Sequence, residues 1–322
     1  MQFIRTSRLY ALALIAALAL TLAACGNANN TSTSGAEASE QPSQEASSGK
    51  IAIQDELGTV ELDKAPEKIV VLEFSYADAL VTLGVQPVGL ADDDDPSLLM
   101  DEVKDKLGSY TSVGSRYEPN LEKISSLQPD LIIADTDHHK NVLDQLKAIA
   151  PTVVLNDHLA DYNMALDNYM IIAKALGKEA EGQKRLEEHK ATVEAEQQKI
   201  KETGYTILPA VVNPKGFFAQ SDHSFAGSFL TSIGYDDPVK NEEAYPQLSL
   251  EQLSETNPEV IVLLPTEENT IVKEWESNPL WDKLDAVAGG KVLTAERRNW
   301  ALSRGLIGSE HIIKDIAAQL GE

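Results

Sequence analysis

A fourteen-residue pattern that occurs twice constrains the fold of this 322-residue chain more than any other feature. Asn120–Ile133 reads NLEKISSLQPDLII, and Ser249–Val262 reads SLEQLSETNPEVIV, with five identical positions. In each copy a polar residue suited to capping a helix precedes a glutamate, Glu122 or Glu251, whose charge favours a helix start. A proline then precedes an apolar, strand-like run. The repeat predicts two α/β halves, although Leu-Glu and Pro-Asp/Glu are also ordinary helix-start and strand-entry sequences.

Short apolar runs alternate with helical patterns through the rest of the chain, which is typical of α/β proteins. Strands are predicted at Lys68–Glu73, Val85–Leu90, Asp130–Ala134, Thr152–Leu155, Thr206–Val212, Val260–Leu264 and Lys291–Thr294. Helices are predicted at Tyr76–Leu83 with Ser75 as N-cap, at Val142–Ile149 and at Ser309–Leu320. A long helical stretch runs from about Asp161 to Glu202, with Gly177 and Gly182 as candidate breaks. The sequence therefore predicts two α/β lobes joined by one long helix.

The first 24 residues have the form of an export signal. Arg5 and Arg8 precede a ten-residue apolar stretch, Ala11–Leu20, which is too short to span a bilayer. Leu-Ala-Ala before Cys25 resembles the lipobox of bacterial lipoproteins and implies that Cys25 is lipidated, an ordinary Ala-x-Ala signal being the alternative. Residues 25–50 are predicted to be this cysteine and a flexible polar tether. Such a chain is expected on the extracytoplasmic face of the cell membrane.

Charge and cysteine content exclude several classes of function. Aspartate and glutamate number 51 against 27 lysines and arginines, a net charge of −24. This excess of acid disfavours binding to nucleic acid or to an anionic membrane through a basic face. A single cysteine supports neither a disulfide framework nor a cysteine-based metal site. The sequence also lacks a phosphate loop, a Rossmann glycine pattern and an HExxH motif, so we expect no enzyme.

Together these features resemble the substrate-binding lipoproteins of iron–siderophore ABC importers. The features are the export signal, the lipobox, the tether, two α/β lobes, one linking helix and the paired LE…P[DE] segments. The resemblance covers Ile51–Glu322. Within that family, Val71–Asp93, Val113–His139 and Arg298–Gly308 are similar to the branch that binds ferric dicitrate.

The resemblance implies a fold, a function and partners. The fold is that of a class III periplasmic binding protein, with lobes at residues 51–160 and 204–322 and a spine helix at 161–203. The function is to capture ferric citrate and deliver it to the permease and ATPase subunits of an ABC importer, as a monomer without a cofactor. The alternatives are a binding protein for another ferric siderophore and a protein that binds a divalent metal directly.

The resemblance also implies two docking residues. Glu122 and Glu251 correspond to glutamates on top of the two lobes that dock onto arginines of the permease. Two exposed carboxylates at a fixed separation can meet two guanidiniums bidentately and set the docking register. The alternative is that each glutamate is only a helix-start charge.

The ligand site is expected between the lobes, near the carboxyl ends of the strands. Citrate itself supplies the oxygen ligands that ferric iron prefers, so the protein should offer cations and neutral donors and no direct metal ligand. Outside the signal the chain has five arginines, and all but Arg185 fall in loops that face the cleft in this family. Salt bridges to the chain's own acids are the alternative role for some of them. The four expected at the ligand are Arg116, Arg297, Arg298 and Arg304.

Other ligand candidates come with competing interpretations. Ser75 and Tyr76 lie at the start of a predicted helix, whose backbone amide groups could bind an anion. The alternative is that these residues only cap the helix. His138 and His139 suit hydrogen bonding to citrate better than metal ligation, because no carboxylate stands at a metal spacing. Further candidates are Ser224 and Phe225 at the start of a helix, and Trp300, which either walls the ligand or packs in the core.

Overall fold

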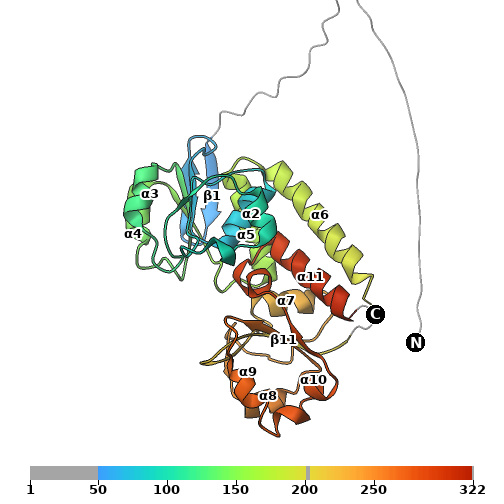
Figure 1. Ribbon diagram of the computed structural model, residues 1–322. Coiled ribbons are helices and arrows are strands. Elements are labelled where there is room, and N and C mark those ends of the chain that lie inside the picture. The colour runs from blue at the N-terminus through green and yellow to red at the C-terminus, as the bar shows by residue number, and fades with distance from the viewer. Residues whose placement is uncertain (1–49, 201–203, 321–322) are drawn as a thin grey trace, which may run out of the picture. The chain divides into compact units, whose positions relative to one another are not determined.

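The computed structural model describes residues 50–200 and 204–320 (Figure 1). The predicted export signal, the lipidated Cys25 and the tether up to residue 49 lie outside these residues and stay predictions. The described residues contain two five-stranded sheets and a hairpin of β1 (Ile51–Asp55) with β2 (Gly58–Leu62). Helices accompany both sheets, so the predicted α/β fold is confirmed.

The first sheet is entirely parallel. Its strands, in spatial order, are β5 (Thr111–Ser112), β4 (Gly89–Leu90), β3 (Ile69–Val71), β6 (Leu131–Asp135) and β7 (Thr152–Leu155). The connecting helices are α1 (Phe74–Thr82), α2 (Asp101–Lys106), α3 (Leu121–Leu127) and α4 (Leu143–Ile149). Strand β6 buries Leu131 and Ile133 in one apolar cluster and Ile132 and Ala134 in another. A parallel sheet covered on both faces requires such continuous apolar strands.

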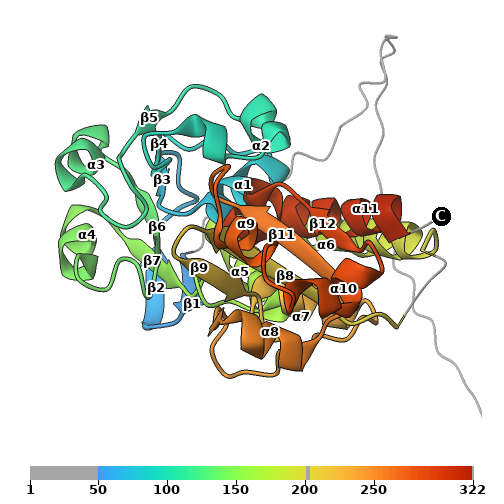
Figure 2. The same cartoon turned by 60° about the horizontal axis from the view of Figure 1, so that its bottom comes forward.

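The second sheet is mixed (Figure 2). Its strands, in spatial order, are β10 (Gln247–Leu248), β9 (Gly216–Ala219), β8 (Ile207–Asn213), β11 (Val260–Pro265) and β12 (Val292–Thr294). Strands β8, β11 and β12 are parallel, whereas β9 is antiparallel to both of its neighbours. The helices of this half are α7 (Phe225–Ser232), α8 (Leu250–Thr256), α9 (Ile271–Trp275) and α10 (Asp285–Ala288).

The linking stretch consists of two helices, where the sequence predicted one. Helix α5 (Tyr162–Ala175) ends before Gly177, whose φ of +66° is a left-handed conformation that favours glycine, and α6 (Glu179–Gln197) follows. Gly182 does not break α6. A Cβ atom on Gly182 would lie 2.6 Å from that of Ala173, so this glycine allows α6 to pack closely on α5.

Three helices pack against both halves of the fold. Helix α5 places Ile172 in the cluster of the first sheet and Ala165 in that of the second. Helix α11 (Leu306–Leu320) places Leu306 in the first cluster and Ile313 in the second. Helix α6 lies beside α11 (Figure 1) and also contributes to both clusters. The two sheets are therefore joined by shared apolar packing and not by a single connecting helix.

The repeated segments have the local structure that their sequences predict. Asn120 caps α3 by accepting a hydrogen bond from the backbone N–H of Lys123 at 2.9 Å. Ser249 caps α8 in a reciprocal arrangement with Gln252, whose side chain accepts from the Ser249 N–H at 2.9 Å. A left-handed residue ends each helix, and a buried strand follows. The prediction of a capped helix before a strand is confirmed in both copies.

Three predicted boundaries are wrong. The strand at Val85–Leu90 is reduced to Gly89–Leu90, because the Val85 N–H bonds back to the Leu80 carbonyl at the end of α1. The N-cap position of α1 is Glu73 and not Ser75. Helix α11 begins three residues before the predicted Ser309.

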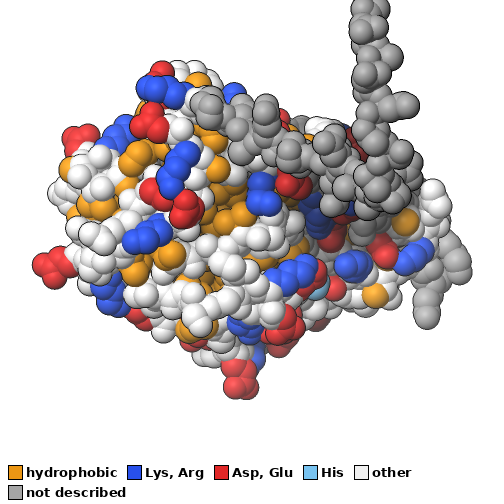
Figure 3. Space-filling view, turned by 90° about the horizontal axis from the view of Figure 1, so that it is seen from above, with side chains coloured by type: hydrophobic (Ala, Val, Ile, Leu, Met, Phe, Trp, Pro, Cys, Tyr) orange, Lys and Arg blue, Asp and Glu red, His pale blue; other side chains and the backbone are white. Residues whose placement is uncertain are grey.

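The surface carries charges of both signs. On the face in Figure 3, acidic and basic side chains are interspersed with apolar ones. Within the described part of the chain, no helix combines the length and the apolar character needed to cross a membrane.

Candidate functional site

Acidic residues end or follow four of the five strands of the first sheet. Glu73 follows β3, Asp93 follows β4, Asp135 ends β6 and Asp157 follows β7. Because the carboxyl ends of parallel strands share one edge of the sheet, these carboxylates gather there. Glu73, Asp135 and Asp157 are at most 2% exposed. None of these four acids was predicted as a site residue from the sequence.

Asp135 fixes the two loops that follow β6 and β7. Its Oδ1 accepts from the backbone N–H groups of Asp137 and His138, at 2.8 and 2.7 Å. Its Oδ2 accepts from those of Asp157 and His158, at 2.7 and 3.1 Å. Burial raises the pKa of Asp135, but these hydrogen bonds outweigh burial and hold the pKa below its ordinary value. One buried carboxylate thus positions both loops.

Two arginines from different halves of the fold meet at Glu73. Arg116, which follows β5, donates from Nε and Nη2 to Oδ2 of Asp93, at 3.1 and 2.8 Å. Arg304, which precedes α11, donates from the same two atoms to Oδ2 of Asp157, at 3.2 and 2.8 Å. Oε2 of Glu73 lies 3.6 Å from Nη1 of Arg116 and 3.9 Å from Nη2 of Arg304. Each guanidinium is therefore already paired with carboxylates of the chain.

Glu73 is an unusual carboxylate. Burial raises its pKa to about 7, against the opposing effects of a hydrogen bond from His138 and the charges of Arg116 and Arg304. Its Oε1 lies 2.6 Å from Nδ1 of His138. Burial alone lowers the pKa of His138, but the hydrogen bond and charge of Glu73 raise it overall. The centre of the site is thus a compensated cluster of two guanidiniums, buried carboxylates and an imidazole.

Several predicted ligand residues lie in or beside this cluster. Arg116, Arg304 and His138 are at its centre. Arg297 is half-buried, and burial together with the positive charge of Arg116 lowers its pKa. The next three predicted residues make hydrogen bonds at the strand ends. Ser75 donates to Asp157, Tyr76 donates to the Ala134 carbonyl, and His139 accepts from the Asp135 N–H.

The remaining predicted ligand residues have other surroundings. Arg298 forms a bidentate pair with Asp101, at 3.0 and 2.9 Å. Ser224 is buried as the N-cap of α7. Phe225 and Trp300 pack in the apolar cluster of the second sheet, 2% and 1% exposed. For Trp300, the structure therefore matches the core alternative.

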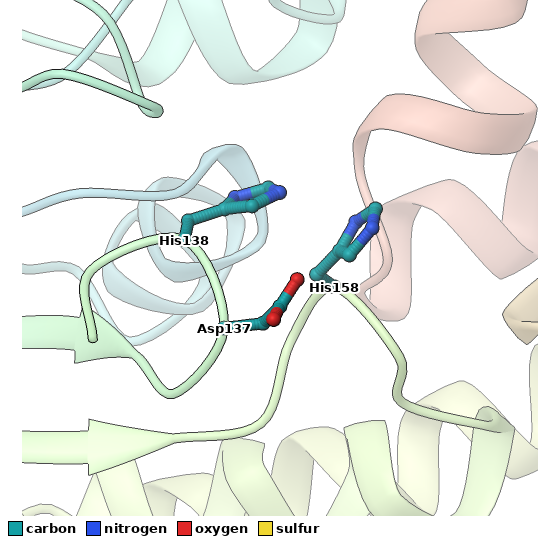
Figure 4. A group of neighbouring side chains, drawn as sticks. All are labelled: Asp137, His138 and His158. Carbon is teal, nitrogen blue, oxygen red and sulfur yellow. The ribbon is translucent and has the colours of Figure 1, made fainter. Parts of the chain in front are cut away.

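The two predicted histidines lie apart, and a third histidine lies beside His138. His139 is fully buried and tied to the end of β6, and its ring centroid lies 6.3 Å from that of His138. The ring of His158 lies 4.4 Å from His138 instead (Figure 4). One possible ligand atom from each of Asp137, His138 and His158 lies within 4.8 Å of the others, and Glu73, Asp135 and His138 form a second such group. Among residues 50–200 and 204–320, these two groups are the ones that could hold a metal.

The two glutamates of the repeat lie at the exposed starts of their helices. Glu122 is in the first turn of α3 and Glu251 in the first turn of α8. Glu251 also lines a groove of about 890 Å³, together with Lys215, Glu274 and Trp275. Hydrogen bonds from its own backbone N–H and from Ser249 lower the pKa of Glu251.

The structure combines two α/β halves with a charged site at the strand ends, an arrangement suited to binding a solute. Residues 69–298 match the family described as periplasmic binding protein, and the chain belongs to this family. It is 40% identical to the Fe(3+)-citrate-binding protein YfmC of Bacillus subtilis (strain 168), over 96% of this chain and 98% of the relative. It is 37% identical to the Fe(3+) dicitrate-binding periplasmic protein FecB of Escherichia coli (strain K12), over 82% of this chain and 88% of the relative.

A solved structure supports the same assignment. The crystal structure of Staphylococcus aureus SirA complexed with staphyloferrin B matches with a TM-score of 0.74 and 27% identity, over 84% of this chain and 98% of that one. The predicted resemblance to siderophore-importer binding proteins is confirmed by these relatives. The family and these relatives are solute-binding proteins, so the chain is a binding protein and not an enzyme.

Proposed function

We propose that this chain is the lipid-anchored solute-binding component of an ABC importer and that its ligand is ferric citrate. Two relatives of 40% and 37% identity are named for ferric citrate and dicitrate. The observation that carries the proposal is the pair of buried arginines, Arg116 and Arg304, which come from the two halves and pair with carboxylates. A guanidinium fork binds a carboxylate through two parallel hydrogen bonds, so the same groups suit citrate.

In this proposal Arg116 and Arg304 bind carboxylates of the citrate, and Arg297 and His138 lie beside them. Ferric iron is cargo, and its oxygen ligands come from citrate. Arg116 and Arg304 are also paired with Asp93 and Asp157, so in this proposal each guanidinium shares its donors between a carboxylate of the chain and one of the ligand. We take the rest of the organisation from the sequence. Residues 1–24 are a signal, and a lipidated Cys25 begins a tether that runs to residue 50. The lobes at 51–160 and 204–322 are joined through 161–203, and the protein is a monomer that docks through Glu122 and Glu251.

Titration of the protein tests this ligand. We expect preformed ferric citrate to change the tryptophan fluorescence saturably, and iron alone and citrate alone not to do so. Arg116→Ala should weaken binding by about 1.5–3 kcal/mol, the range for a hydrogen bond to a charged group. Lys240→Ala, which removes an exposed salt bridge to Asp236, is the control and should bind normally. Unchanged affinity in Arg116→Ala contradicts the assigned clamp.

A panel of ferric chelates separates the alternative ligands. The rise in melting temperature should be largest with ferric citrate, because a ligand stabilises the folded protein more the more tightly the folded protein binds it. A larger effect with another carboxylate or catecholate chelate would assign the chain to a different siderophore. Saturation by a bare divalent ion, with no response to any ferric chelate, would favour a direct metal-binding protein.

A further inference from the structure

Two loops of the first sheet bring imidazole and carboxylate groups together. Strands β6 and β7 are parallel neighbours, with Asp135 opposite Leu155 in the register. The loop after β6 carries Asp137 and His138, and the segment after β7 carries His158. Figure 4 shows the two imidazole rings next to each other with the Asp137 carboxylate beside them. Topology therefore places three metal-ligating side chains at one point of the sheet edge.

The backbone under these side chains is held in place. The four hydrogen bonds that Asp135 accepts tie both loops to one fully buried carboxylate. One potential ligand atom from each side chain lies within 4.8 Å of the other two. Zinc-bound nitrogen and oxygen atoms stand about 2.0–2.2 Å from the metal, so the three side chains must move closer together to share one ion.

Glu73 occupies the position of an outer partner of such a site. Its Oε1 lies 2.6 Å from Nδ1 of His138, which leaves Nε2 of that ring for a metal. Metal-ligating histidines almost always donate their other ring N–H to a carboxylate or carbonyl, which fixes the tautomer. Lys140 lies 3.2 Å from Oδ1 of Asp137, which leaves Oδ2 for a metal.

We propose that His138, His158 and Asp137 form a binding site for a divalent transition-metal ion, with Zn²⁺ as the best match. Two imidazoles and one carboxylate suit Zn²⁺ and its neighbours in the first row, and not Ca²⁺ or Mg²⁺. The fourth position of a tetrahedral ion stays open to water or to a carboxylate oxygen. This site shares His138 with the proposed ferric citrate site, but its chemistry differs, because the protein supplies the ligand atoms and citrate is not required.

Metal titration of the chain from residue 25 onward, without the predicted signal, tests the proposal. The protein carries Cys25→Ser so that no thiol competes, is treated with a chelator, and is titrated in citrate-free buffer with Zn²⁺. Co²⁺ serves as a spectroscopic probe, since its visible absorption reports tetrahedral nitrogen and oxygen ligands. We expect one equivalent of Zn²⁺ to bind and to displace Co²⁺ from this site.

Variants assign the ligands. His138→Ala, His158→Ala and Asp137→Asn should each weaken Zn²⁺ binding by at least about 100-fold, and Glu73→Gln by roughly 10–100-fold, as for other outer partners. His223→Ala removes an exposed histidine outside the cluster and should bind Zn²⁺ like the parent chain. If Glu73→Gln impairs folding because Glu73 is buried, Asp137→Asn still tests the site, because Asp137 is partly exposed.

Two outcomes overturn the metal site. One is the absence of stoichiometric Zn²⁺ binding, and the other is equal Zn²⁺ affinity in His158→Ala and His223→Ala, which would place the ion elsewhere. Titration of the same samples with preformed ferric citrate keeps the two proposals apart. A chain that binds ferric citrate but no Zn²⁺ refutes only the metal site, and the reverse refutes only the proposed function.

Discussion

Acidic side chains are exposed at the tips of the two halves and buried at the junction between the halves. At the tips, meaning the first turns of α3 and α8, Glu122 and Glu251 are exposed. At the junction, Glu73 and Asp157 are buried and pair with arginine. An exposed carboxylate contributes little to folding and is free to meet a partner, whereas a buried one is tied to its counter-ion. The comparison separates exposed acids, which we propose for docking, from buried acids that hold the site together.

The largest expected effect is on transport, through the tips. The double change Glu122→Ala and Glu251→Ala should abolish uptake and ligand-stimulated ATPase activity in a reconstituted importer, because each half loses its charged contact with the permease. Ferric citrate affinity should stay within about twofold, or 0.4 kcal/mol. The double variant should be worse than either single one, since two anchors on one body reinforce each other.

Charge reversal sharpens this prediction. Lysine at both positions should reduce uptake further than alanine, through repulsion from arginines of the permease. If uptake survives the double alanine change and only the melting temperature falls slightly, the glutamates are helix-start charges and the comparison between tips and junction fails.

At the junction the largest effect is on folding. Arg304→Ala should lower the free energy of unfolding by about 3–5 kcal/mol, because it leaves the carboxylate of Asp157 buried without a counter-ion. Urea denaturation measures this loss. The matched control is Arg298→Ala, whose partner Asp101 has a 65% exposed side chain and which should cost less than about 1 kcal/mol. Equal losses of unfolding free energy in Arg304→Ala and Arg298→Ala would contradict the claim that the buried ion pairs at the junction matter more for folding than an exposed one.

That expectation reverses the one that follows from sequence alone. A cluster of four arginines predicts mutual repulsion, so that removing one changes stability little. The structure instead separates Arg116 from Arg304 by Glu73 and gives each arginine a second carboxylate.

The tips were predictable from sequence and the junction was not, for a physical reason. Helix caps and apolar strands are local patterns, so both repeated segments and strand β7 were predicted correctly. The pair of Arg304 with Asp157 joins residues 147 positions apart, and no local pattern encodes it. The sequence did contain a signal for these acids, because an acidic residue comes directly after each of four strand-like runs. These are Glu73 after VVL, Asp92 and Asp93 after GLA, Asp135 after LIIA and Asp157 after VVLN. Trp300 was ambiguous, because apolar character suits a cleft wall and a core equally.

A further buried carboxylate at the junction, Asp78, predicts a pH dependence. Asp78 is fully buried, accepts from the Ile307 N–H at 3.0 Å, and burial raises its pKa to about 7 from an ordinary 3.8. A carboxyl whose pKa is higher in the folded state binds more protons there, so its contribution to stability falls as pH rises from about 4 to about 7. Asp78→Asn should therefore be more stable than the parent chain at pH 8, by on the order of 1–3 kcal/mol.

The measurement is a series of urea denaturations between pH 4 and pH 8. The difference between variant and parent should vanish towards pH 4, where Asp78 is protonated in the folded protein. Glu310→Gln is the contrasting control. Burial raises the pKa of Glu310, but hydrogen bonds from His189 and Arg185 lower it overall, so its stabilisation is lost as pH falls. A pH-independent difference for Asp78→Asn would show that this carboxyl is charged in the fold.

The smallest effects distinguish the two tips from each other. Helix α8 has a reciprocal cap, in which Ser249 and Gln252 each satisfy a backbone N–H of the other, whereas Asn120 in α3 acts alone. Gln252→Ala should therefore lower the free energy of unfolding by about 0.5–1 kcal/mol, the value of one hydrogen bond. Lys123→Ala, at the equivalent position of α3, should change it by less than about 0.5 kcal/mol, as for an ordinary surface site. Neither change should alter uptake, because the docking glutamates remain. Equal losses in the two variants would mean that the reciprocal cap adds nothing to the single cap.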